Sequence, residues 1–201
     1  MNIKNIAILT TRTSWFYPHA EQLKLLLKNM GYAAELFSNH EDISDQYKVV
    51  FILSYFKIIP EKFLDEHTHN LVVHESDLPE GKGWSPLSWQ ILEGKNRIPI
   101  SLFEAAKDVD AGDIYLKDEI VLNGDELNEE IHALQSKKTI EMCLSFLENY
   151  NNLKSQQQQG EETFYDRRRP ADSELDIEKS IKEQFNLMRI ASNEEYPLFF
   201  N

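Results

Sequence analysis

Two short polar stretches in this sequence combine residue types that can move protons. His74 ends the strand-like run 70–74 and is followed by Glu75 and Ser76, while Asp110 comes about 36 positions later, in VDAGDI. If the two loops adjoin, the carboxylate of Asp110 can orient the imidazole of His74 and stabilise its charged form, as acid–base chemistry requires. Each stretch alone is weak evidence, because a lone histidine is more often structural and D-x-G-D is often a turn.

The elements that would position these residues alternate between strands and helices. Short apolar runs predict strands at 4–10, 32–37, 48–53, 70–74, 98–104 and 114–122. Helical spacing and flanking stop signals predict helices at 21–30, 60–66, 85–93 and 125–149. This alternation indicates an α/β fold with a Rossmann-like wound, mostly parallel sheet. Such sheets bind ligands at the carboxyl ends of their strands, where His74 is expected to lie.

Three parts are expected along the chain. Residues 1–150 form the principal domain, and residues 151–162, which include four consecutive glutamines, are typical of a polar linker. Residues 163–201 are expected to form a small helical and irregular C-terminal extension, with an arginine run at 167–169 and an amphipathic helix at 176–190. Cys143 lies on the apolar stripe of helix 125–149, so we expect a core residue there and not a reactive thiol.

The residues after the first strand exclude several nucleotide-binding motifs. Neither G-x-G-x-x-G nor G-x-x-x-x-G-K follows residue 10, so NAD, FAD and P-loop ATP chemistry are not expected. Ser14 is expected to cap the first helix. Arg12 and Trp15 are candidates to face a ligand at the carboxyl edge of the sheet.

The composition limits the partners and the compartment. With 34 acidic against 21 basic side chains, the net charge of −13 opposes binding to a nucleic acid backbone. A single cysteine excludes an intramolecular disulfide and a multi-thiolate zinc site. The sequence shows neither a basic, apolar leader nor a run of about 20 apolar residues. We therefore expect a cytoplasmic protein that does not enter a membrane.

The stretch HESDLPEGKGWSPLSWQILEG and the later VDAGDI resemble the formyltransferases that use 10-formyltetrahydrofolate, a family that includes glycinamide ribonucleotide, methionyl-tRNA and nucleotide-sugar formyltransferases. The resemblance covers about residues 48–122. It returns in the tail, where RRRPADSELDIEKSIKEQFNLMRI and YPLFF are similar to the C-terminal portion of sugar formyltransferases. Within the family, the sequence is most similar to short bacterial enzymes linked to pseudaminic acid and related amino sugars.

This resemblance implies the formyltransferase fold and a specific reaction. A formyl group would pass from 10-formyltetrahydrofolate, without a metal ion, to a primary amine of an amino sugar, with a nucleotide-linked sugar expected. Such a transfer passes through an oxyanion, and the attacking amine must lose a proton. The implied partner is a small molecule and not a nucleic acid or a membrane, and a homodimer stays open.

The resemblance also implies roles for individual residues. His74 matches the catalytic histidine, and Asp110 matches its acidic partner. The loop 54–60 would hold the pterin ring, together with residues beside Asp110; these cofactor-binding candidates are Tyr55, Phe56, Lys57, Ile58, Ile59, Val109 and Asp113. The candidates for contact with the substrate are Arg12, Trp15, Lys82 and Trp84. Lys82 would meet a substrate phosphate unless it is an ordinary solvated lysine, and Trp84 would stack on the ligand.

One position departs from the family pattern. Family members usually carry an asparagine two residues before the histidine as an amide donor to the oxyanion, and this chain has Val72 there. Asn70 lies ~13 Å from His74 along a strand and is too far away to replace it. The alternative donors are Ser76, a backbone N–H or Gln90, and protonated His74.

Two other functions therefore stay open beside sugar formylation. The first is a different reaction of the same fold, either methionyl-tRNA formylation or formyltetrahydrofolate hydrolysis. The second is a folate- or sugar-binding relative that lost catalysis together with the amide donor.

Overall fold

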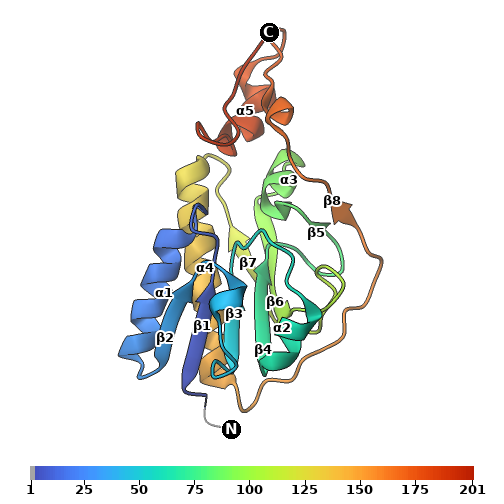
Figure 1. Ribbon diagram of the computed structural model, residues 1–201. Helices are drawn as coiled ribbons and strands as arrows, with labels where there is room; N and C mark the ends of the chain where they lie inside the picture. The colour runs from blue at the N-terminus through green and yellow to red at the C-terminus, as the bar shows by residue number, and fades with distance from the viewer. Residues whose placement is uncertain (1–2) are drawn as a thin grey trace. The chain divides into compact units, whose positions relative to one another are not determined.

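The computed structural model describes residues 3–201, which form two compact units (Figure 1). The first unit contains the chain up to His74, Ser101–Leu116 and Thr139–Gln158. The second unit contains Glu75–Ile100, Lys117–Lys138 and Gln159–Asn201. None of the helices within residues 3–201 combines the length and the apolar character that a membrane span needs.

The central sheet has six strands in the order β2-β1-β3-β4-β6-β7. These strands are β1 (Asn5–Leu9), β2 (Ala33–Phe37), β3 (Val49–Ile52), β4 (His69–His74), β6 (Arg97–Glu104) and β7 (Ile114–Val121). The pairs β1–β2, β1–β3 and β3–β4 are parallel, whereas β6 runs antiparallel to β4. The α/β fold with a mostly parallel sheet is therefore confirmed, and every predicted strand has its counterpart.

Within residues 3–201, five helices accompany the strands: α1 (Tyr17–Asn29), α2 (Glu61–Glu66), α3 (Pro86–Leu92), α4 (Asn128–Asn149) and α5 (Ile181–Arg189). Two short 3₁₀ helices, η1 (His40–Asp42) and η2 (Pro170–Ser173), complete the set. Helix α1 begins four residues before the predicted start, because Pro18 in its first turn already has a backbone suited to a helix. The predicted stop at Gly31 fits its φ of +90°, which favours glycine.

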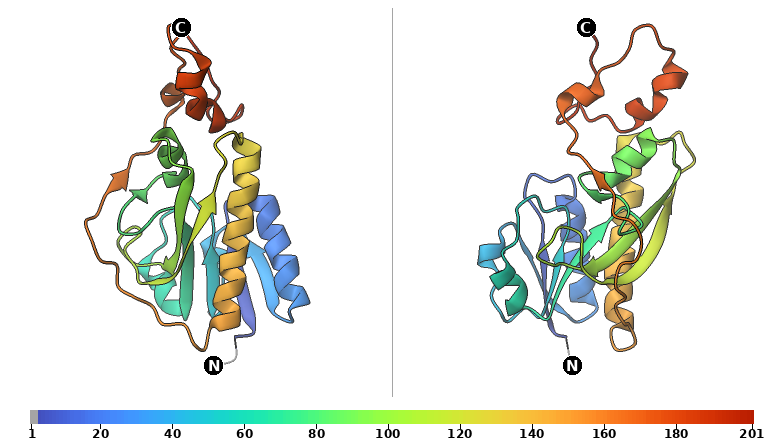
Figure 2. Two further views of the ribbon diagram at one scale, coloured as in Figure 1. Left: turned by 180° about the vertical axis from the view of Figure 1, so that it is seen from behind. Right: turned by 90° about the vertical axis from the view of Figure 1, so that its right-hand side faces the viewer.

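The first unit buries both faces of its parallel strands. On one face Ala7, Leu9, Val50 and Ile52 pack with Phe63 of α2. On the other face Phe51 meets Phe146 of α4 edge to face, with ring centroids 6.4 Å apart. Figure 2 shows α2 and α4 on opposite sides of these strands. Burial on both faces explains why β1 and β3 read as continuous apolar runs, and it gives the site a rigid support.

The second unit contains a small pairing that sequence patterns did not predict. Strand β5 (Lys82–Gly83) pairs in parallel with β8 (Phe164–Tyr165). The contact needs a glycine at position 83, because a Cβ there would lie 2.5 Å from the carbonyl oxygen of Tyr165. Strands of two residues are too short to show a hydrophobic period, so the pairing leaves no signal in the sequence.

Candidate active site

The structure brings His74 and Asp110 together within the first unit. Nε2 of His74 lies 3.6 Å from Oδ2 of Asp110, and the two side chains are only 11% and 12% exposed. This distance is longer than a normal hydrogen bond between nitrogen and oxygen, which is shorter than about 3.2 Å, so the contact becomes an ion pair only when the imidazole carries a second proton. Low exposure strengthens that interaction relative to one at a protein surface.

Asp110 reaches His74 by a route different from the one expected. The sequence suggested two loops at the carboxyl edge of parallel strands, but β6 is antiparallel to β4 and its end, Glu104, pairs with Leu71. The loop 105–112, called here the acid loop, therefore leaves the sheet three residues before His74, about 10 Å along the strand. It folds back so that Asp110 meets the imidazole.

The acid loop has a constrained backbone. Asp110 has a φ of +52°, in the left-handed region that aspartate tolerates better than most residues. At Gly112 a Cβ would lie 1.7 Å from the carbonyl oxygen of Glu104, so only glycine fits. Backbone conformations of this kind occur often at functional sites, where the surrounding structure maintains them.

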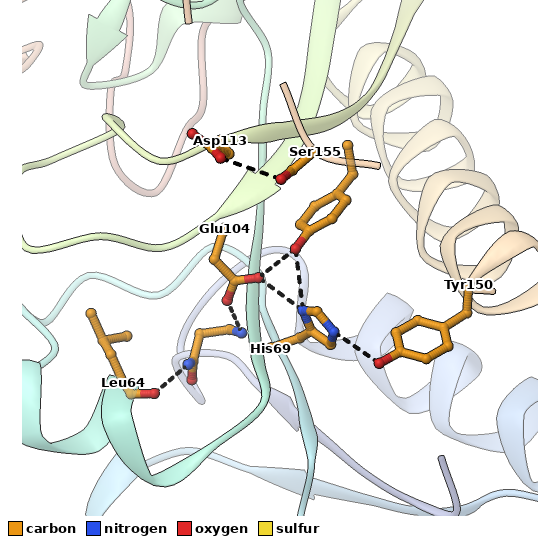
Figure 3. A network of polar contacts seen from close by, with 8 residues as sticks. Leu64, His69, Glu104, Asp113, Tyr150 and Ser155 are labelled. Carbon is orange, nitrogen blue, oxygen red and sulfur yellow. Dashed lines mark hydrogen bonds and ion pairs between the residues drawn. The ribbon is translucent and has the colours of Figure 1, made fainter. Parts of the chain in front are cut away.

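A partly buried polar network fixes the base of the acid loop (Figure 3). Glu104 accepts a hydrogen bond from the backbone N–H of Asn70, and its Oε2 lies 3.0 Å from Nδ1 of His69. The same oxygen accepts from the hydroxyl of Tyr115 at 3.3 Å, and Nε2 of His69 lies 3.1 Å from the hydroxyl of Tyr150. Burial, followed by the charge of Glu104, raises the pKa of Tyr115 to about 12, so this hydroxyl keeps its proton at neutral pH.

The 54–60 loop follows β3 and is tied to the loop after β1. Ser54 has a φ of +49°, and its hydroxyl receives a hydrogen bond of 2.8 Å from Ser14. The backbone N–H of Phe56 donates to Oγ1 of Thr11 at 3.3 Å. The prediction that Ser14 caps α1 was wrong, because the capping position is Phe16 and Ser14 instead accepts from its N–H at 3.1 Å.

The pterin-binding candidates divide by orientation. Tyr55 and Ile59 pack against the core cluster, and the hydroxyl of Tyr55 lies 2.9 Å from Nδ1 of His40. The side chains of Phe56, Lys57, Ile58 and Val109 are exposed. Asp113 accepts a hydrogen bond from Ser155 at 3.3 Å. Tyr55 and Ile59 thus shape the 54–60 loop from inside, and the exposed residues are the ones available to a ligand.

The first unit contains two of the substrate candidates, Arg12 and Trp15. Arg12 is exposed, whereas Trp15 is half-buried and packs edge to face on Phe16, with ring centroids 5.5 Å apart. Both follow β1 at the carboxyl edge of the sheet, as expected.

The other candidates belong to the second unit. Ser76 is buried. Lys82 is not an ordinary solvated lysine: its side chain is 2% exposed and its Nζ lies 2.6 Å from Oε1 of Glu162. Trp84 is 39% exposed, and the guanidinium of Arg167 stacks over its ring at 4.8 Å from the centroid. Trp84 therefore has a face that already binds one planar cation.

The side-chain amides of Asn70, already judged too distant, and of Gln90, a proposed donor, both have other partners. Nδ2 of Asn70 donates to the carbonyl of Leu64 at 2.9 Å. Nε2 of Gln90 donates to the carbonyls of Glu75 and Pro86, at 2.6 and 3.3 Å. Both amide hydrogens of Gln90 are thus in use, which removes it from the set of donors.

One contributor escaped sequence analysis entirely. The side-chain amide of Gln158 donates to the carbonyls of Asp110 and Gly112, at 2.8 Å each. Four consecutive glutamines gave no signal that would single this one out.

Taken together, the structure shows an α/β fold in which His74, at the end of β4, lies close to Asp110 of the acid loop. Residues 22–145 match the family model described as formyl transferase. The chain belongs to the formyl transferase family.

Individual relatives agree with this assignment. A methionyl-tRNA formyltransferase of Francisella philomiragia is 30% identical over 136 residues, which cover 67% of this chain and 44% of that protein. The chain thus spans less than half the length of this curated relative. A solved methionyl-tRNA formyltransferase from Clostridium thermocellum has a TM-score of 0.83 at 26% identity and covers 98% of this chain and 88% of its own.

Two more distant structures show the fold alone. HypX from Aquifex aeolicus, solved in complex with tetrahydrofolic acid, has a TM-score of 0.82 at 18% identity, over 96% of this chain and 35% of its own. A sugar N-formyltransferase from Shewanella sp has a TM-score of 0.72 at 10% identity, over 99% and 93%.

Proposed function

We propose that this chain transfers a formyl group from 10-formyltetrahydrofolate to a primary amine of an amino sugar, with a nucleotide-linked sugar as the acceptor. The observation that carries the proposal is the pairing of His74 with Asp110, at 3.6 Å and largely buried, in a chain of the formyl transferase family. Pseudaminic acid intermediates are the acceptors that the sequence resemblance favours.

The chemistry assigns a task to each member of the pair. 10-Formyltetrahydrofolate supplies the formyl group. As the amine nitrogen forms its bond to the formyl carbon it must lose a proton, and the imidazole of His74 accepts it. The carboxylate of Asp110 stabilises the imidazolium that results and holds the ring in one orientation. His74 can then return the proton to the leaving nitrogen of the folate, which restores the neutral imidazole.

Exposed apolar side chains on the 54–60 loop and the acid loop support a flat aromatic co-substrate. Phe56, Ile58 and Val109 are 52%, 90% and 64% exposed, although they stand on loops anchored to the core. Nζ of Lys107 lies 3.7 Å from Glu61, which connects the acid loop to the helix that follows the 54–60 loop. An aromatic ring seated between these loops would cover apolar surface that water now contacts. The tetrahydrofolate complex of a protein with the same fold agrees with this assignment.

The acceptor class is supported by charge and by the likeness to sugar N-formyltransferases. The net charge of −13 disfavours a polyanionic acceptor such as tRNA. A nucleotide sugar carries few charges, so two or three side chains can bind it; Arg12 and Trp15, which both follow β1, are the residues we propose. Lys82 would have to leave Glu162 to bind a phosphate, so we rank it below them.

Methionyl-tRNA formylation is the second candidate, because the curated relative and the structure from Clostridium thermocellum carry that name. The chain matches only part of that relative's length, so the relative's acceptor does not transfer to it directly.

One experiment separates the candidates. The protein is incubated with 10-formyltetrahydrofolate and a panel of amino-sugar nucleotides, and mass spectrometry is used to detect the gain of one formyl group. We expect one sugar to be formylated, and His74→Ala to abolish the product. A formylated initiator methionyl-tRNA with no sugar product would establish the second candidate. Folate turnover without any amine would indicate hydrolysis, and ligand binding without turnover would refute an enzymatic function.

A further inference from the structure

The segment 155–158 makes specific contacts with the chain that follows Asp110. The backbone N–H of Ile114 donates to the carbonyl of Gln156 at 2.8 Å, and the N–H of Gln156 returns a bond of 2.9 Å. Beside this pair, the hydroxyl of Ser155 donates to Asp113 at 3.3 Å, as Figure 3 shows. Gln156 thus forms an isolated antiparallel bridge with Ile114, the first residue of β7, just after the acid loop.

The side chain of Gln158 continues these contacts into the acid loop itself. Its Nε2 donates one hydrogen to the carbonyl of Asp110 and the other to the carbonyl of Gly112, both at 2.8 Å, across 48 and 46 positions of sequence. Its Oε1 is buried and has no hydrogen-bond partner among residues 3–201. A buried acceptor without a partner costs free energy. The two hydrogen bonds donated by Nε2 offset this cost, and they favour the observed position of the side chain.

The acid loop needs an external restraint of this kind. Asp110 is held at a positive φ, and Gly112 passes against the carbonyl of Glu104 with no room for a side chain. Backbone carbonyls that are shielded from water need hydrogen-bond partners, and carbonyls left without one are costly. Gln158 satisfies two of them at once and thereby fixes the backbone on which the carboxylate of Asp110 stands.

We propose that Gln158 is a positioning residue for the acid–base pair, which it serves by holding Asp110 at its distance from His74. This inference rests on the proposed function, because it assumes that the pair acts in formyl transfer. Only an amide can do this at position 158: a glutamate of the same size has no hydrogens for the two carbonyls.

The test compares Gln158→Ala and Gln158→Glu with Gln157→Ala, a matched control at an exposed neighbouring glutamine. The substrate is the amino-sugar nucleotide identified by the panel. We expect both Gln158 variants to lose about 10- to 100-fold in kcat with a KM for the sugar within about twofold, because small displacements of a catalytic group act on the chemical step. The control should match the wild type.

A double-mutant cycle separates positioning from general stability. In an Asp110→Asn background, Gln158→Ala should cause little further loss, because the two residues act through one contact. An equal loss in both backgrounds would show a merely structural role and overturn the inference. Unchanged kcat in both Gln158 variants would also overturn it.

A measurement that needs no substrate keeps the inference separate from the proposed function. Hydrogen exchange of the peptide 105–114, followed by mass spectrometry, should become faster in both Gln158 variants and stay unchanged in Gln157→Ala. Equal exchange in all proteins would refute the positioning role even in an active enzyme. If His74→Ala kept full activity, the proposed function would fail, whatever the exchange data show.

Discussion

Replacing Asp110 with asparagine removes one negative charge and leaves the shape of the side chain nearly unchanged. With 3.6 Å between Nε2 of His74 and Oδ2 of Asp110, the charge interaction with an imidazolium is worth about 4.6 kcal/mol at an effective dielectric constant of ~20. Solvation of the two groups offsets part of this, and a value of about 2 kcal/mol is a reasonable lower bound. Since each 1.36 kcal/mol in the barrier corresponds to about tenfold in rate, kcat should fall between about 30-fold and about 2,000-fold.

The assay is steady-state formylation of the identified amino sugar at saturating 10-formyltetrahydrofolate. The matched control is Asp108→Asn, which removes the same charge from an exposed position of the same loop. If charge beside the imidazole is what matters, Asp108→Asn should stay within about threefold of the wild type, because exposed charges are screened by water and salt. An Asp110→Asn enzyme that kept a third or more of the wild-type kcat, or an equal loss in both variants, would refute the reasoning.

Three further predictions concern stability and reactivity. Arg189→Met should lower the free energy of unfolding by about 3–5 kcal/mol in denaturant titrations. The reason is that the buried carboxylate of Glu126 loses the guanidinium that lies 3.2 Å from it. The control, Lys182→Met on the exposed face of α5, should have little effect. Burial would raise the pKa of Glu126, but backbone N–H groups of Asn123 and Gly124 and the charge of Arg189 outweigh it and lower the pKa. The charged carboxylate of Glu126 therefore stabilises the fold above about pH 4.3, and this contribution is lost as the pH falls through the lower folded-state pKa. In Glu126→Gln, the free energy of unfolding should accordingly depend less on pH in the acidic range. Burial raises the pKa of Cys143, which is fully buried, so iodoacetamide should label this thiol only after denaturation, as intact-mass measurements would detect.

The strands and helices were predictable where burial leaves a recognisable pattern of apolar residues in the sequence. Strands such as β3, with all four residues buried, can only be continuous apolar runs. The direction of a strand leaves no such pattern, which is why the antiparallel course of β6 and the return of the acid loop were not foreseen. The contacts of Arg189 leave no such pattern either, although its guanidinium bonds Glu126, Asn96 and Asn186 and so fixes the tail.

The site was predictable only where a residue type is rare enough to be informative. A histidine at the end of a strand and a D-x-G-D sequence are each weak signals, but together with the resemblance to a family they indicated His74 and Asp110. A glutamine among four glutamines does not stand out, and neither does a hydroxyl such as that of Ser14, whose partner Ser54 is 40 positions away. Positioning contacts of this kind depend on tertiary structure and have no local signature.

The absence of an amide at position 72 changes which groups can stabilise an oxyanion in the proposed reaction. Both amide hydrogens of Gln90 are donated to backbone carbonyls, and Asn70, which donates to the carbonyl of Leu64, lies too far along the strand. This leaves Ser76, a backbone N–H or the protonated imidazole of His74. The last of these makes the carboxylate of Asp110 more important than it would be beside an asparagine donor, because the imidazolium would then bind the oxyanion as well as carry the proton. On this reasoning, the loss in Asp110→Asn should lie toward the upper end of the range, and Ser76→Ala should lose activity only if its hydroxyl shares the task.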